Sequence, residues 1–190
     1  MILRSVFAVA ISTALMAVPS IAQEEAQPEP EITYEGLAVG TAYFRDTFTD
    51  WRLRCQKTVD GNDPCQLFQL LADETGGTVA QIVVFNLNTT EGPAVAGANV
   101  TVPLETALRE GIRLQVDDNP AKAYPFAYCD DIGCHARLGL TAVELKAMQD
   151  GSAARLVTVP YRGERKPVIV QVSLQGFTAG YKAVVENNQP

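Results

Sequence analysis

The stretch Trp51-Arg52-Leu53-Arg54-Cys55 alternates apolar and polar side chains. A period of two residues is typical of a β-strand with one buried face and one solvated face. The segment Cys65-Gln66-Leu67-Phe68-Gln69-Leu70-Leu71 is also rich in strand-forming residues, and it follows the turn-prone Asp60-Gly61-Asn62-Asp63-Pro64. The sequence therefore predicts two strands brought side by side between residues 51 and 71.

Comparable apolar runs continue along the chain. They predict further strands at residues 80–87, 100–104, 112–116, 126–129, 134–138, 155–159 and 167–174. Clusters of Gly, Pro, Asn and Asp separate these runs at short intervals, and this pattern disfavours βαβ units. We therefore expect a mainly β fold, an antiparallel β-sandwich or barrel-like single domain with one or two short helices.

One helix is predicted after residue 140. Thr141 and Glu144 have the spacing of a capping box, and Gly151 is placed to end the helix in the left-handed conformation. A second helical turn is possible between residues 173 and 183, although Gly176 and Gly180 weaken it.

The N-terminus has the organisation of a secretory signal peptide. Arg4 precedes an apolar run at residues 6–18, and Ser20-Ile21-Ala22 places small residues at the −3 and −1 positions of a cleavage site. The run is too short to cross a bilayer as a helix, although an uncleaved anchor is the alternative. We expect a signal peptide at 1–22, export to the periplasm or the cell exterior, and no transmembrane segment in the mature chain.

The rest of the chain divides into three predicted parts. Residues 23–35, QEEAQPEPEITYE, read as a flexible acidic spacer because they contain too few large apolar side chains to form a core. Residues 36–185 form the predicted β-rich domain, and residues 186–190 are expected to fray.

Composition limits the chemistry. The chain has 190 residues, 15 Lys and Arg, 22 Asp and Glu and one His, with a net charge of −7. This acidic balance argues against nucleic-acid binding, which requires a basic surface. We predict no metal site and no cofactor, because the Asp60–Asp63 segment reads as a turn and lacks calcium-loop spacing.

The cysteine residues are Cys55, Cys65, Cys129 and Cys134. In an oxidising compartment an even number of cysteines predicts disulfides, and four cysteines allow three pairings. The spacing favours Cys55–Cys65 and Cys129–Cys134. A redox enzyme that uses Cys129, Cys134 and His135 is the alternative, although the neighbouring Asp130-Asp131 would raise a thiol pKa.

Five motifs in order resemble the invasion-associated locus B (IalB) family of alphaproteobacteria. They are Phe48-Thr49-Asp50-Trp51 leading to Cys55; Cys65; Val102-Pro103-Leu104 followed by Leu108 and Gly111; Tyr124-Pro125-Phe126 followed by Cys129, Gly133, Cys134 and Ala136; and Ser173-Leu174 followed by Gly176-Phe177. Glu105 stands where the family usually has glycine, which predicts a different turn at that point.

The resemblance implies an exported envelope protein, linked in some pathogens to entry into host cells, and it implies no enzyme activity. The motif residues read as scaffold: Phe48, Asp50, Trp51, Pro103, Gly111, Gly133, Gly176 and Phe177.

We therefore expect a non-catalytic binding protein of the bacterial envelope or the host-cell surface. Its partner is unknown, and peripheral membrane association remains open. The alternatives are the thiol-redox or other envelope enzyme, and a chaperone-like factor that binds nascent envelope proteins through an exposed sheet edge.

Overall fold

The structure is a computed structural model that describes residues 34–73, 76–89 and 91–189. The predicted signal peptide at 1–22 and nearly all of the predicted spacer at 23–35 lie outside these residues. The packed body begins at Tyr34, two residues before the predicted boundary. The Tyr34 ring stacks on Tyr43 with 4.5 Å between centroids, and its hydroxyl donates to the Phe44 carbonyl oxygen at 2.7 Å.

Seven strands form the larger sheet. In chain order they are β1 (Ala42–Phe48), β2 (Trp51–Gln56), β3 (Cys65–Ala72), β4 (Thr78–Asn86), β5 (Ala94–Val102), β8 (Phe126–Cys129) and β9 (Cys134–Thr141). Their order across the sheet is β1-β2-β3-β4-β5-β9-β8, and every neighbouring pair is antiparallel.

Four strands form the smaller sheet. They are β6 (Ile112–Val116), β7 (Lys122–Tyr124), β10 (Ala153–Thr158) and β11 (Val168–Ser173), in the order β11-β10-β6-β7. These pairs are also antiparallel. The two sheets share one hydrophobic core, so the predicted antiparallel sandwich is confirmed.

Helix α1 (Ala142–Asp150) joins β9 to β10, and α2 (Phe177–Asn187) follows β11. The predicted capping box is present, with Thr141 Oγ1 accepting from the Glu144 N–H and the Glu144 side chain accepting from the Thr141 N–H. The left-handed end predicted at Gly151 is wrong. Gly151 has φ −75° and ψ 164° because the chain leads in an extended conformation directly into β10. Neither helix in the described part of the chain is long and apolar enough to span a membrane.

Helix α2 begins and ends four residues later than the predicted segment 173–183, and the expected frayed end is wrong for residues 186–188. Asn188 Oδ1 accepts from the Cys65 N–H at 2.8 Å, and its Nδ2 donates to the Cys65 carbonyl at 2.8 Å. Asn187 Nδ2 donates to the Asp63 carbonyl at 2.8 Å. The two asparagine side chains therefore occupy the free backbone groups at the start of β3.

The start of α2 depends on Gly176. This residue has φ +84°, and a Cβ there would lie 1.9 Å from the Phe48 carbonyl oxygen. Glycine therefore permits a close approach between the β1–β2 turn and the β11–α2 turn. Gly180 likewise leaves room for the Leu67 side chain, which a Cβ at this position would meet at 2.5 Å.

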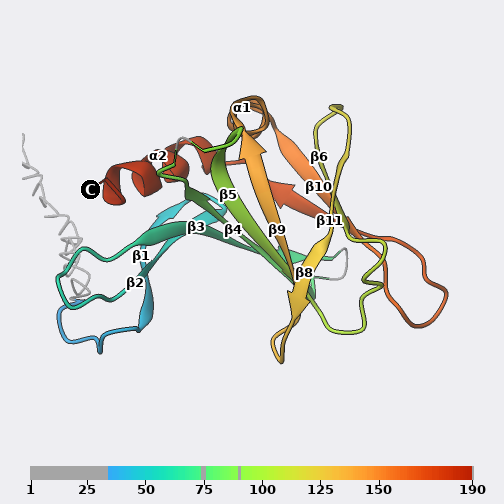
Figure 1. Cartoon of the computed structure of the whole chain (residues 1–190), viewed down its shortest axis with the longest axis horizontal. Coiled ribbons are helices and arrows are strands. Elements are labelled where there is room, and N and C mark those ends of the chain that lie inside the picture. Colours follow the sequence, from blue (N-terminus) through green and yellow to red (C-terminus); the bar gives the residue numbers. More distant parts are fainter. Residues whose placement is uncertain (1–33, 74–75, 90, 190) are drawn as a thin grey trace, which may run out of the picture. The chain divides into compact units, whose positions relative to one another are not determined.

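The core is organised around Trp51 and Phe177, which are fully buried with ring centroids 5.2 Å apart. The indole N–H of Trp51 donates to the Ser173 carbonyl at 2.8 Å, and this bond joins the two sheets. Alternate residues of the large sheet point towards α2 and the small sheet. We call this side the inner face. Figure 1 shows both helices above the large sheet.

Candidate binding face

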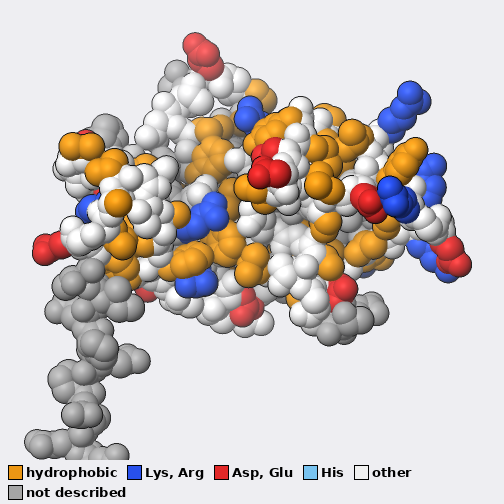
Figure 2. Space-filling view, turned by 90° about the horizontal axis from the view of Figure 1, so that it is seen from below, with side chains coloured by type: hydrophobic (Ala, Val, Ile, Leu, Met, Phe, Trp, Pro, Cys, Tyr) orange, Lys and Arg blue, Asp and Glu red, His pale blue; other side chains and the backbone are white. Residues whose placement is uncertain are grey.

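The opposite side of the large sheet carries a different set of side chains. We call this side the open face. Its members are Phe44, Arg52, Arg54, Gln66, Phe68, Leu70, Gln81, Val83, Phe85, Asn99, Thr101, Tyr128, His135 and Arg137. None of them is acidic. Figure 2 views the molecule from below and shows basic side chains among hydrophobic ones on this side, together with acidic side chains from outside this set.

Strand register arranges the open face in rows across the sheet. One row consists of Arg52, Phe68, Val83, Asn99 and Arg137, which are successive cross-strand partners on β2, β3, β4, β5 and β9. The next row in one direction contains Arg54 and Gln66, and the next in the other contains Gln81, Thr101, His135 and Tyr128. Residues from strands far apart in sequence therefore meet on one surface.

Two arginines are stacked on aromatic rings. The Arg52 guanidinium carbon lies 3.3 Å from the Phe44 ring centroid, and that of Arg54 lies 4.7 Å from the Phe68 centroid. The two rings contact one another at 5.5 Å. Partial burial lowers the pKa of Arg54 from its usual value, although the group stays charged at neutral pH. Stacking therefore fixes both guanidinium groups on the sheet.

These positive charges lack internal partners. Arg52, Arg54 and Arg137 form no ion pair with a carboxylate among the described residues. With its amide oxygen turned towards Arg54, Gln66 accepts hydrogen bonds from Nη2 at 2.7 Å and Nε at 3.1 Å, and it is neutral. The guanidinium charges are therefore available to an external anion.

His135 is held at one side of the face. Its Nδ1 lies 3.1 Å from Thr101 Oγ1, its Nε2 lies 2.9 Å from Asp130 Oδ1, and its ring stacks on Tyr128 at 4.6 Å. The hydrogen bond from His135 lowers the pKa of Asp130. Arg137 completes the group, 5.4 Å from the Tyr128 centroid. Both ring nitrogens of His135 are occupied, so the arrangement resembles a fixed support more than a general base.

Two shallow hollows lie on either side of Phe85. The larger, about 630 Å³, is bordered by Arg54, Gln66 and Phe85, and the smaller, about 360 Å³, by Phe85, Asn99 and Arg137. A Cβ on Gly97 would lie 2.4 Å from the Phe85 ring. The ring therefore lies close against the β5 backbone, where glycine leaves room for it.

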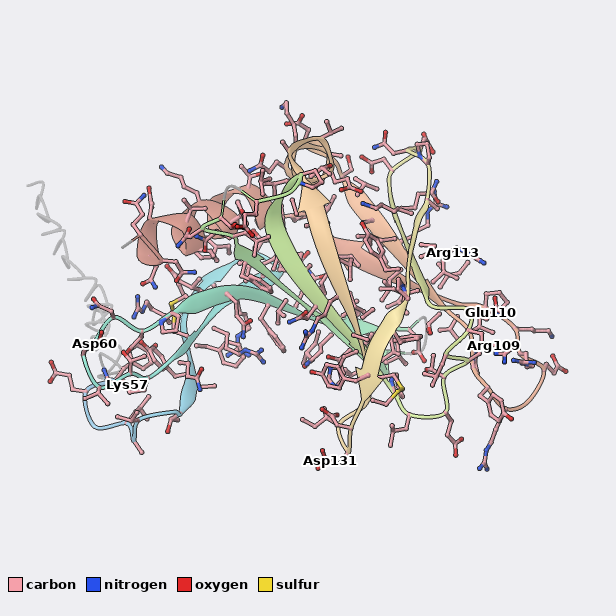
Figure 3. The ribbon with its side chains drawn as sticks, in the orientation of Figure 1. Lys57, Asp60, Arg109, Glu110, Arg113 and Asp131 are labelled. Carbon is pink, nitrogen blue, oxygen red and sulfur yellow. A yellow bond between two sulfur atoms is a disulfide. The ribbon has the colours of Figure 1, made fainter. Side chains whose placement is uncertain are left out.

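The four cysteines form the two local disulfides favoured by the spacing. Cys55–Cys65 links β2 to β3 and Cys129–Cys134 links β8 to β9, and no cysteine in the described residues is free. Both pairs lie in strand ladders and lack the helix N-terminus that stabilises a catalytic thiolate. Figure 3 shows Lys57 and Asp60 on the loop of the first pair and Asp131 on the loop of the second.

The loop closed by Cys55–Cys65 contains a buried carboxylate. Asp63 accepts hydrogen bonds from the Tyr43 hydroxyl at 2.7 Å, the Thr58 N–H at 2.8 Å and Thr58 Oγ1 at 3.0 Å, and Lys57 Nζ lies 3.4 Å away. The bond from Tyr43 is the main reason that the pKa of Asp63 lies well below its usual range. No cluster that could hold a metal ion occurs in the described parts of the chain.

The predicted scaffold residues lie away from the open face. Phe48, Asp50, Trp51, Gly176 and Phe177 meet where the two sheets join, and Asp50 Oδ2 accepts from Ser173 Oγ at 2.5 Å.

The remaining scaffold residues lie in turns. A Cβ on Gly133 would lie 2.3 Å from the Val102 carbonyl, and one on Gly111 would lie 2.4 Å from the Tyr124 carbonyl. Pro103 O accepts from Thr106 Oγ1 at 2.9 Å. Glu105 has φ +67°, a left-handed conformation that usually favours glycine.

The sheet edges offer little for strand addition. The edge strands β7 and β8 have three and four residues, and β1 is interrupted by an irregularity between Phe44 and Asp46. At the end of β11, the Ser173 N–H and carbonyl are both bonded to the Gln69 side chain. Short or irregular edges resist pairing with another chain, which weakens the chaperone-like alternative at β1, β7 and β8, whereas at β11 only Ser173 is occupied in this way.

The sequence predicted the disulfide cysteines but not the open face. Arg52 and Arg54 already stood at the solvated positions of the opening alternation, and this was the available signal. Their placement in one surface with Arg137 depends on strand order, which one sequence does not give.

Comparison with known proteins gives consistent matches. Residues 51–185 match the family described as Invasion associated locus B (IalB) protein. Invasion protein B homologs from Brucella abortus strains 2308 and 9-941 are each 26% identical over 143 residues, covering 75% of this chain and 80% of theirs. The crystal structure of invasion associated protein B from Bartonella henselae is similar with a TM-score of 0.63 and 20% identity, covering 74% of this chain and 94% of that one. The chain therefore belongs to the invasion-associated locus B family.

Proposed function

We propose that this protein is exported and acts without catalysis, by binding a component of the bacterial envelope or of a host-cell surface through its open face. The observation that carries the proposal is a set of three arginines that share one sheet face, lie over aromatic rings and have no carboxylate partner in the described chain. The whole sequence is acidic, with a net charge of −7, so this basic face is a local exception. Charge segregated in this way favours association with an anionic partner.

Export is supported by the N-terminal sequence and by the two disulfides. The sequence of residues 1–22 has the form of a signal peptide, and both disulfides suit an oxidising compartment. Mass spectrometry of protein purified from the producing cell should give a mature N-terminus at Gln23. Recovery of a chain that retains Met1 in the cytoplasmic fraction would contradict export.

Binding can be tested with a charge-reversal pair. Arg52→Glu/Arg137→Glu should abolish the saturable binding of labelled mature protein to washed bacterial envelopes or to host-cell membranes. The matched control is Arg113→Glu/Arg155→Glu, which changes charge equally on exposed positions of the small sheet. Equal binding by both variants would contradict the open face as the contact surface.

The proposal includes a specific role for this protein in entry into host cells. It is supported by the names of the relatives, which are invasion proteins. A deletion strain should enter cultured host cells less often, and the control variant should restore entry while the open-face variant should not. Full restoration of entry by the open-face variant would show that entry does not depend on the open face.

A further inference from the structure

The open face has features that specify the chemistry of its partner, provided that it is the binding surface proposed above. Arg52 and Arg137 stand at opposite ends of one row, with Phe68, Val83 and Asn99 between them. The two arginines are separated by four inter-strand steps, which at about 4.8 Å per step is about 19 Å. A single carboxylate, sulfate or phosphate group cannot reach both.

Arg54 adds a third charge beside the first. It lies two residues along β2 from Arg52, or about 7 Å away. The face therefore presents paired charges on one side and a single charge on the other. Repeated negative charges along an extended chain match this pattern better than one compact anion does.

The surface between the arginines is uncharged, with the buried apolar Phe68 and Val83 in the row itself and hydrogen-bonding amide side chains beside them. Gln66 and Asn99 present amides, and the partly buried Phe85 ring stands between the two hollows. Amides match the hydroxyl groups of sugars, and a ring face matches the apolar face of a sugar ring. The hollows are shallow and lack the deep apolar pockets that anchor large side chains of a protein partner.

We infer that the open face binds an extended anionic polysaccharide across the strands, with acidic groups on Arg52, Arg54 and Arg137 and uncharged sugar hydroxyls on Gln66 and Asn99. Guanidinium groups suit this role because Arg52 and Arg137 can bind carboxylate or sulfate through two parallel hydrogen bonds. Arg54 donates from Nε and Nη2 to Gln66, so it contributes mainly its positive charge. Stacking on Phe44 and Phe68 holds two of them in place before the ligand arrives, which reduces the entropy lost on binding.

The test uses the mature chain and defined polymers. Polygalacturonate carries one carboxylate on each sugar and heparin carries sulfates, while dextran is neutral. Polyglutamate represents an acidic peptide, and vesicles with phosphatidylglycerol represent an anionic membrane. Binding is measured by calorimetry or by polarisation of a labelled polymer at low and at raised salt.

We expect binding to polygalacturonate or heparin that weakens as salt increases, and no binding to dextran. Arg52→Ala/Arg137→Ala should weaken it by about a hundredfold, since each lost charge-assisted contact is worth about tenfold. The single variant Arg137→Ala changes only an exposed side chain and should lose about tenfold with no change in circular dichroism. The control Arg113→Ala/Arg155→Ala should bind as the native chain does.

Three outcomes would overturn the inference. They are no binding to either acidic polysaccharide, tighter binding to polyglutamate or to the vesicles, and unchanged affinity in Arg52→Ala/Arg137→Ala. The first two leave the proposed function intact if the charge-reversal variant still loses binding to envelopes or host membranes. If the charge-reversal variant still bound both the acidic polysaccharides and the envelopes or host membranes, both proposals would be overturned.

Discussion

Trp51 and Arg52 are neighbours in β2 and point to opposite faces of the same sheet. Trp51 has no exposed surface, contacts Phe177 and gives its N–H to the Ser173 carbonyl. Arg52 is exposed, lies over the Phe44 ring and pairs with no carboxylate in the described chain. The inner face therefore satisfies its groups internally, and the open face leaves charges unsatisfied.

This difference separates what the fold requires from what a partner can use. An apolar side chain on the inner face is determined by volume and shape, because interiors are closely packed. A stacked arginine on the open face contributes little to stability, so its value lies in what it can bind. Substitutions on the two faces should therefore affect different measurements.

The largest expected effect comes from Trp51→Ala. Removing a buried ring and its hydrogen bond between the sheets should lower the free energy of unfolding by about 3–5 kcal/mol. Arg52→Ala, one residue away on the open face, should cost about 1 kcal/mol or less. Urea unfolding followed by circular dichroism measures both. Similar losses for the two variants would erase the distinction between the faces.

The second prediction concerns the Cys55–Cys65 disulfide, which lies on the inner face of the large sheet. Cys55 and Cys65 are directly paired on the inner face, next to the pair Arg54 and Gln66 on the open face. Cys55→Ala/Cys65→Ala should lower the free energy of unfolding by about 2–3 kcal/mol, since the closed loop is short. The five-residue separation in Cys129–Cys134 predicts a loss smaller by a few tenths of a kcal/mol in the matching variant. A larger loss there would show that the outer hairpin, not the inner face, limits stability.

The sequence predicted regular strands with a buried face more accurately than short or irregular ones. Strands with regular alternation and large side chains, such as β2 and β3, were placed well because burial on one face determines the pattern. Strand β1 was missed because its register shifts between Phe44 and Asp46, and β7 because it has three residues. The start of β5 was also missed, since its Ala and Gly residues have low strand propensity.

The candidate site depends on information that a single sequence lacks. Arg52 and Arg54 could be assigned to a solvated side, but Arg137 is 85 positions further along the chain than Arg52. Only the pairing of β5 with β9 brings it into the row. The asparagines at the end of α2 were misjudged for a related reason, because their partners at Cys65 are far away in sequence.

A smaller effect on stability, with a clear effect on the open face, is expected for Gly97→Ala. The new Cβ would contact the far edge of the Phe85 ring, which can turn away, so the cost should be about 1 kcal/mol. The displaced ring should disturb both hollows and weaken polymer binding. Gly139→Ala is the control, because its Cβ would meet only the Ala94 methyl group at 3.2 Å. Equal affinities of the two variants for the polymer would show that Phe85 does not contribute to binding.

The last prediction contrasts Asp63, a charge that the fold satisfies, with the arginines that it leaves free. Hydrogen bonds, first that from Tyr43, lower the folded-state pKa of Asp63 below the unfolded value of about 3.9. A lowered carboxyl pKa stabilises the fold above the unfolded pKa, and this contribution is lost as pH falls through the folded pKa. Urea midpoints should therefore fall less between pH 5 and pH 2 in Asp63→Asn than in the native chain. Asp60→Asn should change this dependence less, because solvent screens that exposed carboxylate. Parallel curves for Asp63→Asn and the native protein would mean that the Tyr43 and Thr58 bonds do not favour the ionised form, and the contrast with the unpaired arginines would then fail.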